Sequence, residues 1–504
     1  MAQEVELKLR LSPRQAARLI RHPALAGSAP TRQRLLNTYF DTADRALSQR
    51  SVALRQRRKG WDWLMTVKGG DPASGGLARR NEWEAPTQPG LFDFGIVTDD
   101  DLRDFLESQR DRLEPLFTTD FTRTAWLLER DGVRIEVALD RGQINANRPP
   151  SGDAAASLPL CELELELIAG DSIDALFDLA IELAQDLRLH PEAASKAERG
   201  YMLANATVPQ PQKAGASPVR ADMSPVEAFR AVALSCLGHL QRNEAGAIAG
   251  DDPEFVHQAR VAIRRLRSAL RLFAPVLPTS FIEIYSPRWR TVAGSLGGAR
   301  DWDVFLDETL APLETAFPGD ADLARVREKG EAIQAQAQAS AGVTLGKPDY
   351  SQLLLAFTAA LFRLDSTPAA APASKADRKL TDFARRRLRR RARQIAQLAS
   401  DHGKMNATRR HEMRIAFKKL RYALEFFAPI LPAKRLRQYQ PALAQIQDLL
   451  GQLNDLVTAS RLIKELHPKG EPSLTRGWIA GRTALLVDTL GPALRQLLAT
   501  RTPW

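Results

Sequence analysis

Charged side chains alternate with aliphatic ones at the start of the chain. Glu4, Glu6 and Lys8 are separated by Val5 and Leu7. A period of two predicts a β-strand with one charged face and one apolar face. In a strand that is half exposed, the charged face would simply meet water. Two carboxylates and an ammonium group on one face are also the groups that bind a divalent cation and the phosphates that accompany it.

Five further segments repeat this arrangement, so the first strand does not stand alone. Their charged or inward positions are Arg55 and Arg57; Thr66 and Lys68; Arg80, Glu82 and Glu84; Glu136, Ala138 and Asp140; and Glu162, Glu164 and Glu166. Strands of this kind fit a closed antiparallel β-barrel with a polar interior and helices on its outside. The interior would mix carboxylates with Lys and Arg, which is what a metal-bound polyphosphate needs.

The order of these motifs resembles the CYTH superfamily, the triphosphate tunnel metalloenzymes. An E-x-E-x-K strand (Glu4, Glu6, Lys8) is followed by basic strands, a late E-x-E strand (Glu162, Glu164) and a closing Lys196 with Arg199. The likeness covers about the first two hundred residues. It implies an inorganic triphosphatase, which hydrolyses triphosphate to diphosphate and phosphate. The superfamily also contains adenylyl cyclases, thiamine triphosphatases and RNA-capping triphosphatases, so a nucleoside or thiamine triphosphate is the alternative substrate.

Roles for these residues follow from the chemistry of a polyanion and from the resemblance. The predicted catalytic residues are Glu4, Glu6, Lys8, Glu82, Glu84, Glu136 and Asp140. The predicted substrate-binding residues are Lys8, Arg55, Arg57, Lys68, Arg123, Lys196 and Arg199. By resemblance, the metal ligands are Glu4, Glu6, Glu162 and Glu164. Hard oxygen ligands favour Mg²⁺ or Mn²⁺, and the expected reaction is in-line attack of a metal-activated water on the terminal phosphorus.

Helices and a linker must surround these strands. We expect helices over Pro13–Leu19, Asp99–Phe105 and Ser172–Leu187, with Ser12 capping the first. The segment Thr207–Asp222 holds several prolines and little to bury, which indicates a linker. From Ser224 onward the strand pattern is replaced by helical periodicity. The predicted fold class is therefore α+β: a closed antiparallel barrel in residues 1–204, a linker in 205–222, and an all-α helical bundle in 223–504.

Charge is divided unevenly between the two predicted domains. The formal net charge of +11 consists of −5 in residues 1–204 (27 Lys and Arg, 32 Asp and Glu) and +16 in residues 205–504 (44 and 28). A carboxylate-rich first half suits divalent cations, while a basic second half suits a polyanion. No apolar run reaches about 18 residues and the N-terminus has no signal pattern. We expect a cytoplasmic protein with no membrane partner, and polyphosphate granules are the candidate place of association.

The second half contains an internal repeat. The 22 residues from His257 to Pro278 align without a gap onto His411 to Pro432, with twelve identities at an offset of 154 residues. A duplicated helical unit explains this, with repeats of about 223–365 and 375–504 on either side of a proline-rich gap. Positions 0, +3, +7 and +10 of each copy fall on one helix face about 80° wide. We name these faces the first stripe (His257, Arg260, Arg264, Arg267) and the second stripe (His411, Arg414, Lys418, Arg421).

Both stripes carry charge of one sign and lack the Glu partners that usually accompany a solvated basic face. This region resembles the CHAD domain, a helical domain named for its histidines, and the resemblance implies binding of inorganic polyphosphate by the two stripes. The helix expected over Asp377–Leu398 adds an arginine run, Arg385 to Arg393, whose role is open. The alternative to an enzyme is a non-catalytic scaffold for polyphosphate or nucleic acid. Aromatic residues do not interleave with the basic faces, so nucleic acid is not expected as the main ligand.

Overall fold

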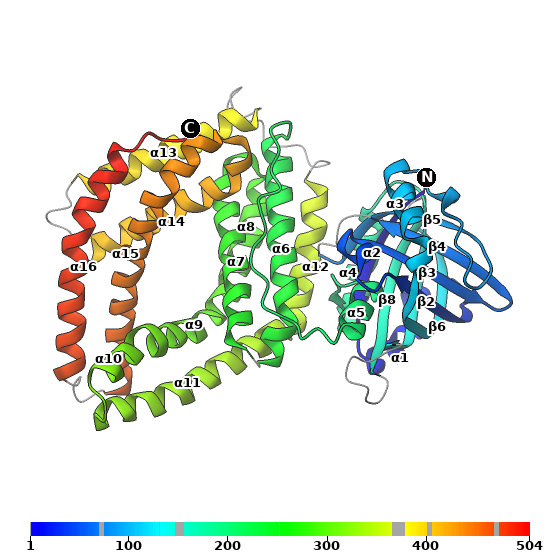
Figure 1. Ribbon diagram of the computed structural model, residues 1–504, viewed down its shortest axis with the longest axis horizontal. Helices are drawn as coiled ribbons and strands as arrows, with labels where there is room; N and C mark the ends of the chain where they lie inside the picture. The colour runs from blue at the N-terminus through cyan, green and yellow to red at the C-terminus, as the bar shows by residue number, and fades with distance from the viewer. Residues whose placement is uncertain are drawn as a thin grey trace. The chain divides into compact units, whose positions relative to one another are not determined.

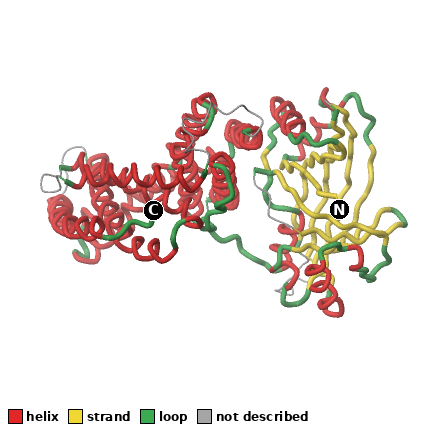
Figure 2. The backbone as a smooth tube through the Cα atoms, turned by 90° about the horizontal axis from the view of Figure 1, so that it is seen from above, coloured by secondary structure: helices red, strands yellow, loops and turns green. Residues whose placement is uncertain are grey.

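The computed structural model describes residues 2–69, 75–130, 132–146, 156–250, 252–364, 379–400, 406–467 and 473–504. Within these ranges all strands precede residue 192, and the chain that follows is helical (Figure 1). Figure 2 shows the same division, with strands in one part of the chain and helices alone in the other. The predicted α+β class, a barrel followed by a helical region, is confirmed. The predicted proline-rich gap after residue 365 lies outside the described residues.

Eight antiparallel strands form a closed barrel in the order β5-β4-β3-β2-β6-β7-β8-β1, and β1 pairs with β5 to close it. A short ninth strand, β9, adds to β1. The strands are β1 Ala2–Arg10, β2 Thr31–Asp41, β3 Val52–Lys59, β4 Asp62–Gly69, β5 Leu77–Pro86, β6 Glu114–Arg130, β7 Val133–Ala146, β8 Ser157–Ala169 and β9 His190–Pro191. Closure leaves no free edge, so the backbone groups of every barrel strand can be paired.

The period of two in β1 determines which side chains enter the barrel. Leu7 and Leu9 point outward, are fully buried, and join an apolar cluster with α4 (Asp174–Asp186). Helix α1 (Pro13–Leu19) completes this cover, and Ser12 caps it as predicted. The alternate residues Glu4, Glu6 and Lys8 must then point into the interior. Burial of the aliphatic face therefore holds the charged face of β1 in place.

Two further helices cover the barrel. Helix α3 (Asp100–Gln109) begins after the predicted acidic residue Asp99, whose carboxylate accepts a hydrogen bond from the Leu102 amide. Helix α5 (Lys196–Ala204) begins with a capping box in which Ser195 and Glu198 satisfy each other's backbone amides. The short helix α2 (Ala46–Gln49) follows β2. The cap at Ser195 fixes the position of Lys196, the first residue of α5.

The predicted linker has neither helix nor strand up to Arg220, but it is not free of contacts. The Gln212 amide donates a hydrogen bond to Asn243 Oδ1 at 2.9 Å, and the Ser217 hydroxyl donates to the Phe426 carbonyl at 2.6 Å. Val219 is buried. The expectation that this segment has little to bury is therefore wrong for its second half, which packs against the helical region.

The helical region begins with α6 (Pro225–Ala249), which has a capping box at Ser224. The remaining helices are α7 Pro253–Phe273, α8 Thr279–Ser295, α9 Gly297–Val304, α10 Ala311–Ala316, α11 Ala321–Leu345, α12 Pro348–Arg363, α13 Leu380–Ala399, α14 Ala407–Phe427, α15 Ala433–Leu466 and α16 Ser473–Ala499. Helices α7 and α14 begin and end at residues exactly one repeat apart, which agrees with the internal duplication. No helix in the described ranges is both long enough and apolar enough to cross a bilayer.

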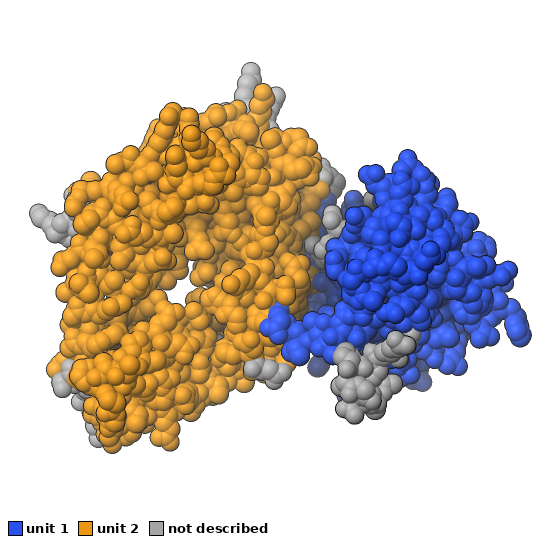
Figure 3. Space-filling view, viewed as in Figure 1, with its two compact units in different colours: residues 1–210, 347–362 blue, residues 211–346, 363–504 orange. Residues whose placement is uncertain are grey.

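Contacts within the chain define two compact units (Figure 3). Unit 1 holds residues 1–210 and 347–362, and unit 2 holds residues 211–346 and 363–504. Most of α12 thus groups with the barrel, although the sequence analysis assigns it to the helical domain. Its Leu355 and Ala359 join the apolar cluster over β1, and the Ser351 hydroxyl lies 2.8 Å from His190 Nδ1. Figure 3 also shows an opening through unit 2.

Candidate functional site

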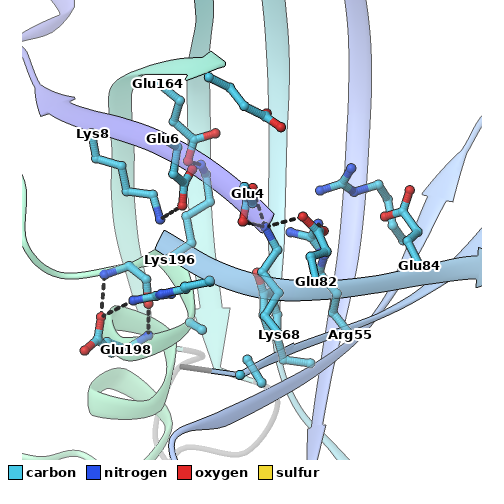
Figure 4. A pocket seen from close by; sticks show the side chains of 18 of the residues that line it. Glu4, Glu6, Lys8, Arg55, Lys68, Glu82, Glu84, Glu164, Lys196 and Glu198 are labelled. Atoms are coloured by element: carbon cyan, nitrogen blue, oxygen red, sulfur yellow. Dashed lines mark hydrogen bonds and ion pairs between the residues drawn. The ribbon is translucent and has the colours of Figure 1, made fainter. Parts of the chain in front are cut away.

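A cavity of about 880 Å³ occupies the interior of the barrel (Figure 4). Charged side chains from Glu4 to Glu198 line it, together with Tyr39 and Tyr201. The lining carboxylates are Glu4, Glu6, Glu82, Glu84, Glu136, Glu164, Glu166 and Glu198. The lining cations are Lys8, Arg55, Arg57, Lys68, Arg80, Arg123 and Lys196. A cavity with so many ionised groups is costly to desolvate unless each charge finds a partner.

On the side of β1, lysines pair with the predicted metal ligands. The Lys8 ammonium lies 2.7 Å from a Glu6 oxygen. The Lys68 ammonium lies 2.7 Å from Glu4 and 3.2 Å from Glu82, as Figure 4 shows. Burial disfavours the charged form of Lys8, but the Glu6 and Glu164 carboxylates outweigh it, so the pKa of Lys8 is raised. Glu4 and Glu6 are thus each paired with a lysine ammonium group, which acts as a point charge on a flexible side chain.

Deeper in the barrel, a buried acidic cluster surrounds Lys196. Carboxylate oxygens of Asp140, Glu162 and Glu164 lie within 4.8 Å of one another. The Lys196 ammonium is 2.7 Å from Asp140 and 2.8 Å from Glu164, and it also pairs with Glu162. Burial opposes its charge, but Asp140 and Glu162 prevail and raise the pKa of Lys196. An ammonium group therefore already occupies the centre of this cluster.

Two arginines complete the neutralisation of the deep cluster. Arg123 contacts Asp140 at 2.8 Å, Glu164 at 2.5 Å and Glu136 at 3.5 Å. Arg199 pairs with Glu162. The pKa of Glu164 is lowered because Lys196 and Arg123 more than offset the effect of burial. Cations thus pair with each carboxylate of this cluster.

Arg57 differs from the other tunnel cations. Its Nε donates a hydrogen bond of 2.9 Å to Asn37 Oδ1, and none of the described carboxylates forms an ion pair with it. Burial, followed by the charges of Arg55 and Arg123, lowers the pKa of Arg57 to about 10. By contrast Arg55 lies 3.4 Å from Glu82. A buried guanidinium without a counterion is a ready site for an anionic ligand.

The two stripes of unit 2 converge on one basic cluster. Burial and then Arg264 lower the pKa of Arg260, and Arg414 from the other repeat adds to this. Burial and the charges of Arg414, Arg264 and Arg260 lower the pKa of Lys418 to about 7. Arg264 and Arg414 each have a buried Nε with no hydrogen-bond partner. Helices α7 and α14, which carry the stripes, border the opening through unit 2 (Figures 1 and 3).

Comparison with known protein families matches residues 2–201 to the CYTH domain and residues 231–464 to the CHAD domain. The chain consists of a CYTH domain followed by a CHAD domain. The predicted resemblance to both families is confirmed, and residues 202–230 and 465–504 lie outside the two matches.

Two relatives illustrate the similarity. The inorganic triphosphatase of Haemophilus influenzae is 34% identical over 207 residues, which are 40% of this chain and 55% of that protein. The chain therefore matches about half the length of this relative. A crystal structure of the CHAD domain from the plant Ricinus communis is 32% identical and has a TM-score of 0.50. That match covers 58% of this chain and 99% of the plant domain.

Most of the predicted residues of the CYTH domain line its cavity. Glu84 accepts a hydrogen bond of 2.8 Å from Thr66 Oγ1 on the neighbouring strand. Asp140, Glu162 and Arg199 do not line the cavity; they lie in the ion-pair cluster behind it. Asp140 and Glu162 are almost completely buried. Their position indicates that they hold Lys196 and Arg199, and whether they act on substrate stays a prediction.

Glu166 is a CYTH-domain residue that the predicted ligand set lacks. It lines the cavity, where burial and then the charge of Glu4 raise its pKa to about 8. Glu164 and Glu6 act in the same direction, while Lys68 opposes them. The period of two in β8 was the available signal, because Glu166 follows Glu164 on the same strand face.

Arg80 is the second residue that was not assigned a role. It lines the cavity from β5, and one of its Nη atoms lies 4.0 Å from Glu198. Its Nε is buried without a hydrogen-bond partner. The alternation of Arg80 with Glu82 and Glu84 predicts its inward orientation, so a basic role could have been assigned from the sequence.

In the CHAD domain the two stripes are not equivalent. Burial and then Arg300 lower the pKa of His257 to about 4, so this half-buried imidazole is neutral at pH 7. His411, at the same position of the second repeat, is exposed. Arg421 lies 3.4 Å from Gln447, while Arg267 faces the charges of Arg271 and Arg290. The centre of the basic cluster is therefore formed by the middle residues of each stripe.

Proposed function

We propose that the CYTH domain hydrolyses inorganic triphosphate to diphosphate and phosphate. The observation that carries this proposal is a closed barrel whose cavity combines seven cations with a set of carboxylates at its β1 side. A triphosphate carries about four negative charges at neutral pH, and Arg and Lys are the side chains that supply permanent positive charge. The similarity to a protein named inorganic triphosphatase supports the same assignment.

The candidate place for a divalent cation is the part of the cavity that Glu4, Glu6 and Glu166 line. Burial, followed by the charge of Glu4, raises the pKa of Glu166 to about 8, and a cation would relieve the repulsion between these carboxylates. Oxygen ligands alone favour Mg²⁺ or Mn²⁺. Such an ion would neutralise phosphate charge and activate a water molecule. The deep cluster of Asp140, Glu162 and Glu164 is less suitable, because the Lys196 ammonium occupies its centre.

The residues of this chain would then divide the remaining work. Arg57, whose guanidinium lacks a counterion, binds phosphate oxygens together with Arg55 and Lys68. Lys8 and Lys68, which pair with Glu6 and Glu4, would contact phosphate instead if those carboxylates held a metal ion. Arg80 stabilises charge on the departing diphosphate. Asp140 and Glu162 keep Lys196 charged and in place. No side chain needs to act as a covalent nucleophile.

The deciding experiment compares substrates with the full-length protein. Phosphate release is measured from triphosphate, ATP and thiamine triphosphate with Mg²⁺ and with Mn²⁺, and cyclic AMP is assayed in the ATP reactions. Preferential release from inorganic triphosphate supports the proposal. Preferential cyclic AMP formation, or no turnover of any triphosphate with either metal, contradicts it and favours a cyclase or a non-catalytic scaffold respectively.

Arg57→Ala is expected to weaken triphosphate binding by roughly 1.5–3 kcal/mol, the range of hydrogen bonds to charged groups. Arg55→Ala should act in the same direction, with a smaller effect because Arg55 already shares Glu82. The measurement is KM and kcat for triphosphate at saturating metal. Arg58→Ala is the matched control, because Arg58 is the exposed next residue of β3 and its Nε bonds to the Gly60 carbonyl. Equal KM values in all three variants would place Arg57 outside the substrate site.

For the CHAD domain we propose that the two stripes bind inorganic polyphosphate. Arg260, Arg264, Arg414 and Lys418 are partly buried and repel one another, and Asp301 and Asp455 offset this only in part. A polyanion would compensate this repulsion. The similarity to a plant CHAD domain supports the fold but does not name a ligand. Competition between polyphosphate and RNA for the full-length protein tests the proposal, and tighter binding of RNA would contradict it.

Polyphosphate binding is expected to weaken as the pH rises through about 7 to 9, because Lys418 loses its charge in the free protein near pH 7. Burial is the largest cause of this depressed pKa; the charges of Arg414, Arg264 and Arg260 add to it, and Asp455 opposes it. A bound polyanion favours the ammonium form, so binding above pH 7 takes up a proton. Titration at several pH values should show this slope in the wild type. Lys418→Arg, which stays charged, should remove it, and equal slopes in both proteins would contradict the assignment.

A further inference from the structure

The internal repeat assigns each residue of α7 a counterpart in α14, and one buried ion pair lies between these helices. Arg265 of α7 pairs with Glu425 of α14, and the Arg265 side chain is only 6% exposed. Its guanidinium also lies over the Phe426 ring, 5.7 Å from the centroid. The neighbouring helix α6 contributes Cys236, whose thiol hydrogen-bonds to Arg265. The charge of Arg265 is therefore balanced by that of Glu425.

The residues at the equivalent positions of the repeat do not form an ion pair of opposite charges. At the offset of 154 residues, Lys419 corresponds to Arg265 and Arg271 corresponds to Glu425. In a duplicated pair of helices, a contact between Arg265 and Glu425 implies a matching contact between Lys419 and Arg271. Burial, followed by the charges of Arg271 and Arg391, lowers the pKa of the half-buried Lys419. Two cations thus stand where the first half has an ion pair.

Helix α13, which packs on α14, adds a third cation, because the charge of Arg391 acts on Lys419. Arg391 has a buried Nη1 with no hydrogen-bond partner. Burial, and then the charges of Arg387 and Arg390, lower the pKa of Arg391 to about 10. Within the described residues no carboxylate pairs with Arg271, Lys419 or Arg391. A partly buried guanidinium with unused donors beside an ammonium group is the arrangement that binds a phosphate group.

We propose that Arg271, Lys419 and Arg391 form a second phosphate site in the CHAD domain, created where the repeat replaces a buried ion pair by two cations. The inference rests on the proposed polyphosphate binding by the stripes. Arg267, the last residue of the first stripe, connects the two places, because the charges of Arg271 and Arg260 both act on it. A polyphosphate chain that leaves the stripes can therefore continue along α7 to this outer site.

The site also explains which part of the arginine run contacts ligand. Arg391 has its guanidinium buried beside α14, whereas Arg389 is exposed and Arg385 lies 3.4 Å from Asp382 of its own helix. The seven arginines between residues 385 and 393 are thus not one uniform surface. Arg391 is the member that the outer site requires, and Arg389 provides a control of the same charge on the same helix.

The test is the affinity of the full-length protein for long-chain polyphosphate at one salt concentration. Arg391→Gln and Lys419→Gln should each weaken binding by about tenfold, the effect of losing one charge-assisted contact, while Arg389→Gln stays near wild type. Arg271→Glu should weaken binding further. It should also raise the Tm of the ligand-free protein, because it restores with Lys419 the ion pair that Arg265 forms with Glu425.

The outcomes separate the outer site from the proposed function. If the wild type binds polyphosphate and Arg391→Gln behaves like Arg389→Gln, the outer site is overturned while the stripes stand. A lowered Tm in Arg271→Glu also overturns it, because the matching contact with Lys419 would then be absent. If the wild type does not bind polyphosphate, the proposed function of the CHAD domain fails and the outer site fails with it.

Discussion

Glu4→Gln is expected to reduce triphosphate hydrolysis on the order of a hundredfold or more while the fold persists. A neutral amide is a poor ligand for a hard cation, and loss of even a supporting group at a metal site costs 10–100-fold in affinity or activity, roughly. Gln has almost the same shape as Glu, and Lys68 keeps Glu82 at 3.2 Å as a partner. The apolar face of β1 is unchanged, so Leu7 and Leu9 still anchor the strand. Glu6→Gln should have a similar effect.

The measurement is kcat and the metal concentration at half-maximal rate, with Mg²⁺ and with Mn²⁺. Circular dichroism and Tm establish that each variant is folded. Glu129→Gln serves as the matched control, because Glu129 belongs to barrel strand β6 and its side chain is 76% exposed. Near-normal turnover of both Glu4→Gln and Glu6→Gln at saturating metal would remove these residues from the metal site and with it the proposed mechanism.

The inward face of the barrel was predictable because strand geometry has a fixed period. Leu7 and Leu9 belong to the apolar core outside the barrel, so the alternate residues Glu4, Glu6 and Lys8 must point into its interior. The same rule applied to β8 includes Glu166 with Glu164. Its absence from the predicted ligand set was a limit of motif reasoning, which stopped at the two glutamates that the family motif contains.

Ion-pair partners inside the tunnel could not be predicted in the same way. Lys196 enters the deep acidic cluster because a capping box fixes the start of α5, and that position depends on how α5 packs across the barrel. The grouping of α12 with the barrel also has no local signal. Its apolar residues Leu355 and Ala359 fit any buried helix, and only the tertiary structure shows that they join the cluster over β1.

Helix periodicity predicted the stripes, but not their unequal environments. His257 and His411 occupy the same position in the repeat, yet one is half-buried beside Arg300 and the other is exposed. Likewise the sequence alone shows that Glu425 aligns with Arg271, but the meaning of that difference requires the ion pair of Arg265 with Glu425. Pairing across helices is set by packing, which periodicity does not contain.

Removal of two central charges from either stripe is expected to weaken polyphosphate binding roughly a hundredfold, since each charge-assisted contact is worth about 1.5 kcal/mol or more. The variants are Arg260→Ala with Arg264→Ala, and Arg414→Ala with Lys418→Ala. Their effects should be similar, because the two stripes lie close enough for the charge of Arg264 to act on Arg414. Arg264 also loses its contact with Tyr422, whose ring centroid lies 5.9 Å away.

Lys434→Ala with Arg437→Ala is the control, because both side chains are exposed on α15 of the same unit. Affinity is measured by titration at two salt concentrations. Wild-type binding should weaken steeply with salt, since a polyanion that contacts several cations releases counterions, and each double variant should show a smaller slope. Triphosphate hydrolysis should stay unchanged in all of them. If affinity does not depend on salt, or if the control pair matters as much as the stripes, then the stripes are solvated helix faces and polyphosphate binds elsewhere.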